Sequence, residues 1–339
     1  MSKPAIRELD RLRRIVRCAQ LYYGLVPGLD GELRQSDVAR RMGVPRSQVV
    51  LWLQEARERF LEIRLRAPRA VELELPLEER LRPFGIREVR IAVDGGLTEE
   101  GAIDAAGAEA ARCIREILAP GMRLGLAGGR TVRSAVRELL RGPVLPCLEL
   151  FPLAAGGSLP VSANALVAML AGAAAEGTAA AGLWVPPLKS GQGRRDLKEF
   201  LSRPEVREVF RAAQDVDAAL IGVGAVEGEA GTRAMMEYLG APEEAARRME
   251  EGPARGFVLQ QFIDGQGADH PCALGERNLA VPLDAMRRMT EAHPRRRVIL
   301  VASSPSKARA AAAAVRGRLA SVLVIDTSLA EALLEEFPA

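Results

Sequence analysis

The sequence is poor in residues that bind metal ions or form covalent cross-links, with four cysteines and two histidines among 339 residues. The cysteines lie far apart and include no CxxC pair, which argues against a zinc site or a disulfide framework. Reduced thiols of this kind are typical of a cytoplasmic protein. We therefore expect a cytoplasmic location, no metal site and no cofactor.

Long apolar runs are also missing. The longest apolar stretch, residues 165–185, is rich in Ala and Gly and contains Glu176, so it predicts a buried helix and strand rather than a membrane span. No signal peptide precedes the first expected helix. The sequence contains no Ser-His-Asp candidate with partners, no paired-carboxylate signature and no Walker loop. We therefore predict no membrane partner, no catalytic residues and no enzyme.

The charge that is present is distributed unevenly. Residues 1–70 contain 15 Lys and Arg against 8 Asp and Glu, whereas the remaining residues contain 32 against 36. A basic N-terminal segment on a mildly acidic remainder favours a small nucleic-acid-binding module joined to a part with another task. The chain length fits two or three such units.

Residues 34–66 have the pattern of a helix-turn-helix. Ser36 is expected to cap a first helix, Gly43 to supply a turn residue with positive φ, and Pro45 to begin a second helix. The buried positions follow at helical spacing: Val38, Ala39 and Met42, then Val49, Trp52, Leu53 and Ala56. A helix over residues 7–23 precedes the motif, and residues 61–65 are expected to form a short strand in the manner of a wing.

The second helix of such a unit normally enters the major groove of DNA. We therefore predict operator DNA as a partner, and an ordinary helical hairpin with a glycine turn is the alternative interpretation. The predicted DNA contacts are the polar and basic residues of the motif: Arg34, Gln35, Ser36, Arg46, Ser47, Gln48, Gln54 and Arg57.

After residue 87, short apolar runs alternate with helical patterns. Strands are expected over residues 89–93, 122–126, 147–153, 181–185, 218–223, 257–263, 298–302 and 322–325. Helices are expected over residues 101–118, 131–140, 164–176, 205–213, 283–292, 306–316 and 328–336. This alternation predicts an α/β fold with a parallel sheet covered on both faces. The expected domains are a helix-turn-helix domain (1–67), a linker with room for a short helix carrying Leu77 and Leu81 (68–86), and an α/β domain (87–339).

In an open α/β sheet, ligands gather at the carboxyl ends of the strands, near helix N-termini. Three loops there are candidates for a ligand site, and each also fits a plainer interpretation as a tight turn, a helix cap or a solvated lysine. Asp264-Gly265 predicts a hairpin turn first and a ligand contact second. The candidate residues are Gly128, Gly129, Arg130 and Thr131 in the first loop, Gly156, Gly157 and Asn164 in the second, Lys307 in the third, and Asp264.

The order of several segments resembles the SorC/DeoR-type sugar-binding transcriptional regulators over nearly the whole chain. The matching segments are YYG (22–24), QSDVARRMGV (35–44), EAR (55–57), GRTV (129–132), DAALIGVG (217–224), QFIDGQG (261–267), ER (276–277), Lys307 and VLVIDTSLAEALL (322–334). The resemblance implies a winged helix-turn-helix joined to a phosphosugar-isomerase-like, Rossmann-like domain. That domain is expected to bind a phosphorylated sugar and to form a homo-oligomer, a dimer or commonly a tetramer, and the effector is expected to alter operator binding.

The sequence departs from this family pattern at both sites. Polar residues are usual on the outward face of the second helix, where this chain has Val50 and Leu51. Ala127 and Gly128 stand where the family often has Ser and an aromatic residue or Gly, and Ser303-Ser304 replaces a Gly-Gly pair. These departures leave open a regulator-like interaction protein with lost or altered effector binding. A second alternative is an enzyme, because sugar-phosphate isomerases share the body that the resemblance implies.

Overall fold

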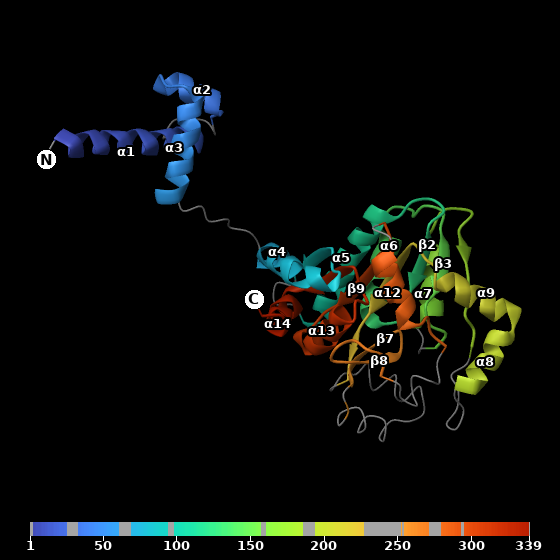
Figure 1. The fold of residues 1–339 in the computed structure, drawn as a ribbon. Helices are drawn as coiled ribbons and strands as arrows, with labels where there is room; N and C mark the ends of the chain where they lie inside the picture. The colour runs from blue at the N-terminus through green and yellow to red at the C-terminus, as the bar shows by residue number, and fades with distance from the viewer. Residues whose placement is uncertain are drawn as a thin grey trace. The chain divides into compact units, whose positions relative to one another are not determined.

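A computed structural model describes residues 3–25, 33–60, 69–93, 98–156, 161–185, 194–226, 252, 254–270, 279–292 and 295–338. The chain divides into two compact units, Met1–Arg66 and Ala67–Ala339, which we call the head and the body (Figure 1). The residues expected to form the wing, 61–65, lie outside the described residues. No helix among the described residues is long and apolar enough to cross a lipid bilayer.

In the head, the described residues form three helices: α1 (Lys3–Tyr22), α2 (Gln35–Met42) and α3 (Arg46–Arg59). Its core contains the expected stripe Val49, Trp52, Leu53 and Ala56 of α3, together with residues of α1 and α2. Gly43 ends α2 with φ of 64°, and its N–H bonds to the carbonyls of Ala39 and Arg40. The expected helix-turn-helix is therefore present. Glycine suits the turn between its helices, because a residue without Cβ adopts the left-handed conformation at little cost.

The expected cap by Ser36 is wrong. The N-cap lies two residues earlier, at Arg34, which has an extended backbone and makes no side-chain hydrogen bond to the helix, so α2 begins at Gln35. Ser36 is an exposed residue of the first turn instead. Asp37, the next residue, supplies the negative charge that favours a helix N-terminus.

The body begins with a helix in the stretch that the sequence suggested as a linker. α4 (Arg69–Leu81) is followed by a 3-10 turn, η1 (Arg82–Phe84). Ala70, Leu73, Leu77 and Leu81 are buried in the body's core at helical spacing. The side chain of Glu74 also accepts a hydrogen bond from the N–H of Ile91, 3.0 Å long. The leucine stripe thus ties residues 69–81 to the body.

Seven strands form a parallel sheet in the order β1-β10-β9-β5-β2-β3-β4. Their bounds are β1 (Glu88–Ala92), β2 (Arg123–Leu126), β3 (Glu149–Pro152), β4 (Ala179–Ala180), β5 (Ala218–Gly222), β9 (Arg297–Ala302) and β10 (Val322–Asp326). The predicted α/β class and parallel sheet are confirmed. The strand expected over 181–185 is displaced, because β4 ends at Ala180.

A second, antiparallel sheet contains β6 (Gly224–Ala225), β7 (Ala254–Val258) and β8 (Gln261–Asp264). The single strand expected over 257–263 is wrong, since the chain turns back at Leu259 and Gln260, with φ of 49° and 64°. An apolar run that is buried on both arms of a hairpin has the same sequence pattern as one buried strand. The hairpin turn expected at Asp264-Gly265 is present at the end of β8.

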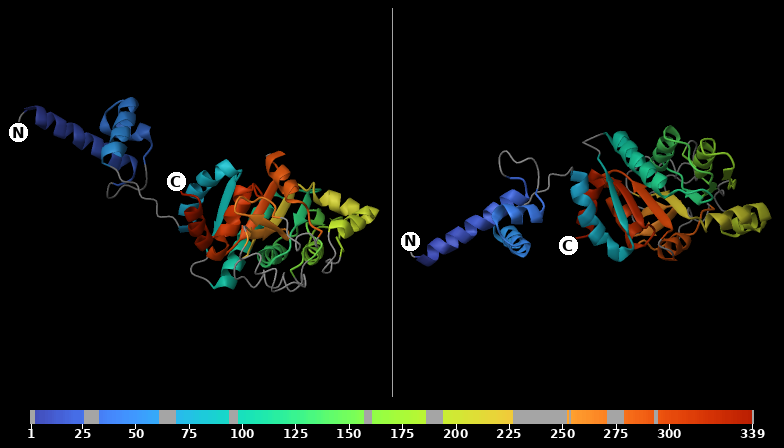
Figure 2. Two further views of the ribbon diagram at one scale, coloured as in Figure 1. Left: turned by 60° about the horizontal axis from the view of Figure 1, so that its bottom comes forward. Right: turned by 90° about the horizontal axis from the view of Figure 1, so that it is seen from above.

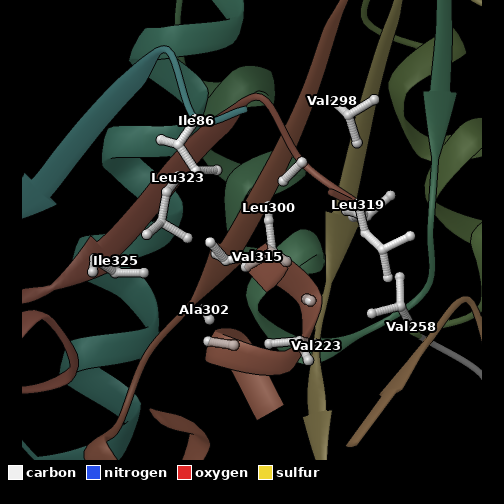
Figure 3. Packing of buried hydrophobic residues seen from close by; sticks show 14 of the residues in the cluster. Ile86, Val223, Val258, Val298, Leu300, Ala302, Val315, Leu319, Leu323 and Ile325 are labelled. Atoms are coloured by element: carbon white, nitrogen blue, oxygen red, sulfur yellow. The ribbon is translucent and has the colours of Figure 1, made fainter. Parts of the chain in front are cut away.

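Helices cover both faces of the main sheet (Figure 2). One face packs against α5 (Glu99–Ile117), α6 (Arg130–Arg141) and α7 (Ala163–Ala171). The other packs against α4, α12 (Leu283–Ala292), α13 (Ala308–Arg316) and α14 (Thr327–Glu336), and Figure 3 shows Val315 of α13 beside Leu300 of β9 in this core. The described residues also form α8 (Arg194–Ser202), α9 (Pro204–Ala213) and the 3-10 turn η3 (Pro305–Lys307), which precedes α13.

The strand order places a switch point between β2 and β5. From β2 the chain continues outward to β3 and β4, whereas from β5 it continues to β9 and β10 on the other side. The chain leaves β2 and β5 in opposite directions along the sheet, and in such folds the carboxyl edge at this switch point is the usual ligand position.

Candidate functional site

Two glycines form the loop between β2 and α6, and each has a structural reason to be glycine. Gly129 has φ of 138°, which L-residues rarely adopt, and a Cβ on Gly128 would lie 2.6 Å from the carbonyl oxygen of Val161. The N–H of Gly129 donates to that same carbonyl, 2.9 Å away. The loop is thus fastened to the segment before α7, and the Gly129 N–H is already bonded within the protein.

Arg130 and Thr131 begin α6 but differ in their surroundings. Thr131 is buried, whereas Arg130 is partly exposed and its Nη2 lies 2.9 Å from the Glu99 carboxylate on α5. Between the first turns of α5 and α6 lies a cleft of about 570 Å³. Apart from Ile103, its lining residues are charged or polar, and they come from both helices and the N-cap of α5: Thr98, Glu99, Glu100, Ile103, Asp104, Arg130, Arg133, Ser134 and Arg137. Sequence analysis missed Glu99 as the partner of Arg130, because only the fold brings residues 99 and 130 together.

The third candidate loop, after β9, holds two buried polar residues at the carboxyl edge. Lys307, in η3, is 8% exposed, and Ser303 is 1% exposed with a hydroxyl that has no hydrogen-bond partner. Ser304 has φ of 84°, and its N–H donates to the buried carboxylate of Asp326. An unbonded hydroxyl in such a place is costly unless a ligand or water completes it. Because Lys307 is buried, the alternative interpretation of this residue as a solvated lysine is wrong.

Asp326 is a residue of this edge that sequence analysis did not single out. Its carboxylate accepts hydrogen bonds from the N–H groups of Ser304, at 3.0 Å, and Leu329, at 2.8 Å, so it caps α14 and holds the β9 loop together. The signal was present in the sequence as an Asp between an apolar strand and Thr327-Ser328, the pattern of a helix N-cap.

Asn164 and Gly156 belong to the segments after β3. The side chain of Asn164 is buried and makes three hydrogen bonds to backbone groups: one to the carbonyl of Ala155 and two to the N–H and carbonyl of Leu183. Both of its donor hydrogens are thereby used, so the expected contact with a sugar hydroxyl has only an acceptor position left. Gly156 is buried, and Gly157 lies outside the described residues.

Asp264 does not lie with the other candidates. Its Oδ1 accepts from the N–H groups of Gln266 and Ala268, which fixes the turn after β8. That turn packs on the C-terminal end of α13, since a Cβ on Gly267 would meet Ala313 and Gly317. Lys307 lies at the opposite end of this nine-residue helix, about 13 Å away along its axis. The first interpretation of Asp264, as a turn residue, is the one that its hydrogen bonds explain.

In the head, four of the predicted DNA contacts lie together. Arg34, Gln35, Ser36 and Arg46 line a hollow of about 540 Å³ at the start of α2 and α3, and Arg46 Nε lies 3.3 Å from the Gln35 side-chain oxygen. Ser47 and Gln54 are exposed on α3, and Gln48 is half-buried. Arg57 donates to the hydroxyl of Tyr23, 2.8 Å away, a bond that raises the pKa of Arg57.

Comparison with known proteins covers both units. The sequence model of the sugar-binding domain family, Sugar-bind, matches residues 69–335. The sorbitol operon regulator of Klebsiella pneumoniae is 26% identical over 338 residues, covering 96% of this chain and 99% of that protein. The transcriptional regulator LsrR of Enterobacter sp. (strain 638) is 27% identical over 335 residues, covering 97% and 94%.

Solved structures agree on the fold. The full-length sorbitol operon regulator SorC from Klebsiella pneumoniae superposes with a TM-score of 0.69 at 22% identity, over 96% of this chain and 99% of that chain. A DeoR family transcriptional regulator from Listeria monocytogenes superposes with a TM-score of 0.66 at 22% identity, over 78% of this chain and 99% of that chain.

Proposed function

We propose that this chain, which belongs to the sugar-binding domain family of SorC/DeoR-type transcriptional regulators, binds operator DNA through its head and a phosphorylated sugar through its body. The observation that carries the proposal is the pairing of a helix-turn-helix in the head with a strand order in the body that has its switch point between β2 and β5, where parallel α/β sheets commonly bind ligands. The relatives matched by the chain are named as transcriptional regulators, so we assign it no enzymatic activity.

In the head, the DNA backbone and the adjacent base edges would be contacted by Arg34, Gln35, Ser36 and Arg46. Arginine and hydroxyl groups at the start of two helices suit phosphate oxygens, which helix N-termini also attract. Ser47, Gln48 and Gln54 would face base edges along α3, and Arg57 would contact a phosphate at its far end. The proposed DNA-binding domain spans residues 1–67.

In the body, the effector would lie at the carboxyl ends of β2, β5 and β9. Lys307 and the unbonded hydroxyl of Ser303 would meet the phosphate, and the first turn of α6 with Thr131 would add N–H and hydroxyl donors. Gly128 would shape the site by letting the backbone of Val161 approach closely, and Gly129 by a positive φ that directs the loop into α6. The buried Gly156 would line the same site from the segment after β3. We also propose a cytoplasmic homo-oligomer, a dimer or tetramer, as the active form.

Regulation would follow from a shift between arrangements of the subunits. An effector changes this equilibrium only by as much as it binds one arrangement better than the other. The spacing between heads then decides whether two half-sites of an operator can be occupied together.

The test of DNA binding is fluorescence anisotropy with DNA from immediately upstream of the gene that encodes this chain, compared with scrambled DNA at two salt concentrations. Specific binding that weakens steeply with salt is expected, because the arginines displace counterions from phosphates. Arg46→Ala should weaken binding, whereas Arg13→Ala, which removes an exposed arginine of α1 that pairs with Asp10, is the matched control. Unchanged binding by Arg46→Ala at fixed salt would overturn the assigned surface.

The test of the effector site uses the same DNA with a panel of sugar phosphates. The wild-type chain should respond to one of them by a change in DNA affinity. Lys307→Met and Ser303→Ala should retain DNA binding and lose or weaken this response. A full response in both variants would show that the effector binds elsewhere.

A further inference from the structure

We propose that Val50 and Leu51 read thymine methyl groups in the operator, which makes them specificity-determining residues of α3. This inference rests on the proposed DNA binding and states what kind of base the head selects. Val50 is 44% exposed and Leu51 is 59% exposed, although both are large apolar side chains.

The two residues lie on the face of α3 that looks away from the head's core. Val49, Trp52, Leu53 and Ala56 are buried, so the other side of the helix carries Ser47, Val50, Leu51 and Gln54. Residues three and four apart on a helix are neighbours on its surface. The exposed stripe therefore places two apolar side chains between a hydroxyl and an amide.

The core of the head does not account for these two side chains. Ile15, Cys18, Val38 and the buried stripe of α3 already fill it, and polar residues at 50 and 51 would leave that packing intact. Adjacent exposed apolar side chains commonly mark a contact surface. A partner with apolar groups at matching places is therefore required.

Charge identifies that partner as DNA. The first two turns of α3 contain no acidic residue and begin with Arg46, and the positive end of the helix dipole lies there as well. Arg34 lines the same hollow as Arg46, and the last turn of α2 adds the exposed Arg40, which pairs with Asp37, and Arg41. Such a surface attracts a polyanion.

Within the major groove, the C5 methyl of thymine is the apolar group that base edges present to a protein. A valine and a leucine at successive positions match methyl groups of neighbouring base pairs. Ser47 and Gln54, about one turn to either side, can bond to flanking bases. The head therefore selects sites in which thymines occupy the centre of each half-site.

The experiment begins with selection of preferred sequences from a random duplex library by the full-length chain. Each thymine of the selected site is then replaced by deoxyuridine, which removes only the C5 methyl, and the Kd is measured by anisotropy at fixed salt. Replacement at the contacted positions should weaken binding about fourfold per methyl group. Replacement at the other thymines should leave the Kd unchanged.

Variants of Val50 and Leu51 test whether these side chains cause the difference in Kd between thymine and uracil. Leu51→Ala and Val50→Ala should bring the ratio of the uracil and thymine Kd values to about one at the position each contacts. Leu75→Ala is the matched control, because Leu75 of α4 in the body is 58% exposed, nearly the same as Leu51. It should retain the full discrimination. Circular dichroism and an unchanged salt dependence establish that each variant folds.

The outcomes separate this inference from the proposed function. Equal binding of uracil and thymine at every position, or discrimination that persists in both variants, overturns the methyl contact while operator binding stands. Sedimentation that shows Leu51→Asp abolishing self-association, with uracil neutral, assigns the face to a second copy of the chain instead. Failure to enrich any sequence, with equal binding to scrambled DNA, overturns the proposed DNA reading and this inference with it.

Discussion

The head and the body present their candidate functional residues in opposite ways. In the head, the predicted DNA contacts occupy the surface of two short consecutive helices, within residues 34–57. In the body, Gly129, Lys307 and Asp326 are far apart in sequence, and the strand order places all three at the carboxyl edge of one sheet, at the ends of β2, β9 and β10. The residues on one face of a helix are determined by the local periodicity of the sequence. The residues that lie together at the carboxyl edge of a sheet are determined by the order of its strands.

The largest effect is expected from a substitution in the core of the head, which tests whether the head and the body unfold independently. Leu53→Ala removes a side chain that is 3% exposed in the head's core and should destabilise the head by about 2–5 kcal/mol. The chain has two tryptophans, and the buried Trp52 reports the head by its fluorescence during urea unfolding. Hydrogen exchange of β9 and β10 reports the body and should not change.

Leu51→Ala is the control for that experiment, since Leu51 is exposed on the same helix. Its effect on the free energy of unfolding should stay within about 0.5 kcal/mol. Equal loss of protection in the body strands of Leu53→Ala would show that the two units unfold as one.

The second test perturbs the body alone. Gly129→Ala forces a side chain onto a backbone with φ of 138° and should destabilise the body by about 1–3 kcal/mol. Gly172→Ala is the matched control, because Gly172 has φ of −69° and no atom closer than 3.6 Å to the added Cβ. Thermal unfolding should separate the two variants, and a stable Gly129→Ala body would contradict the strained loop.

The third test uses pH. Burial raises the pKa of the Cys113 thiol in the body to about 11, from 9.0, so the folded body favours the protonated thiol. The stabilisation is complete below pH 9 and is lost as pH rises through 11, because the unfolded chain loses this proton first. At pH 10 the loss should be about 1 kcal/mol.

Urea unfolding of wild type and Cys113→Ala at pH 8 and pH 10 isolates this effect, since other groups titrate equally in both. The difference between the two pH values should be smaller in the variant. Cys18, whose pKa burial also raises to about 11, should produce the same behaviour in the head through Trp52 fluorescence. Identical pH dependence in wild type and Cys113→Ala would contradict the buried thiol's contribution.

The smallest effect is expected at the ion pair between Arg130 and Glu99. Both side chains are well exposed, 39% and 64%, so Glu99→Gln should change the stability by less than about 1 kcal/mol. The variant frees Arg130 at the start of α6, and phosphorylated ligands should bind somewhat more tightly to it. Glu100→Gln is the control for the change in net charge, and isothermal titration measures both.

The extent of sequence prediction follows the same division. The α3 stripe and the φ > 0 turn at Gly43 could be predicted, since spacing and residue type depend on neighbours only. The parallel sheet could be predicted from alternation. The hairpin β7–β8 was missed, because Leu259 and Gln260 adopt φ > 0 without a glycine to indicate a turn.

At the candidate site, residue types could be predicted and partners could not. The sequence indicated a cation at 307 and a glycine-rich turn at 128–129. It could not show that the Asn164 side chain accepts a hydrogen bond from the N–H of Leu183, or that the N–H of Gly129 donates to the carbonyl of Val161. Both hydrogen bonds depend on the tertiary contacts between loops. The N-cap of α2 was predicted two residues too late, at Ser36 instead of Arg34, within the usual uncertainty of helix ends.

The packing of α4 has a consequence for the connectivity of the body. Arg69 on α4 reaches Glu331 of α14, 2.9 Å away, and Arg80 donates to the carbonyls of Leu334 and Phe337. The body's first and last helices are therefore adjacent (Figure 1). Domains with adjacent ends commonly tolerate circular permutation, so a short peptide that joins α14 to α4 should allow new termini in a surface loop of the body. Deletion of α14 would instead remove the partners of Arg69 and Arg80 and expose α4 to solvent.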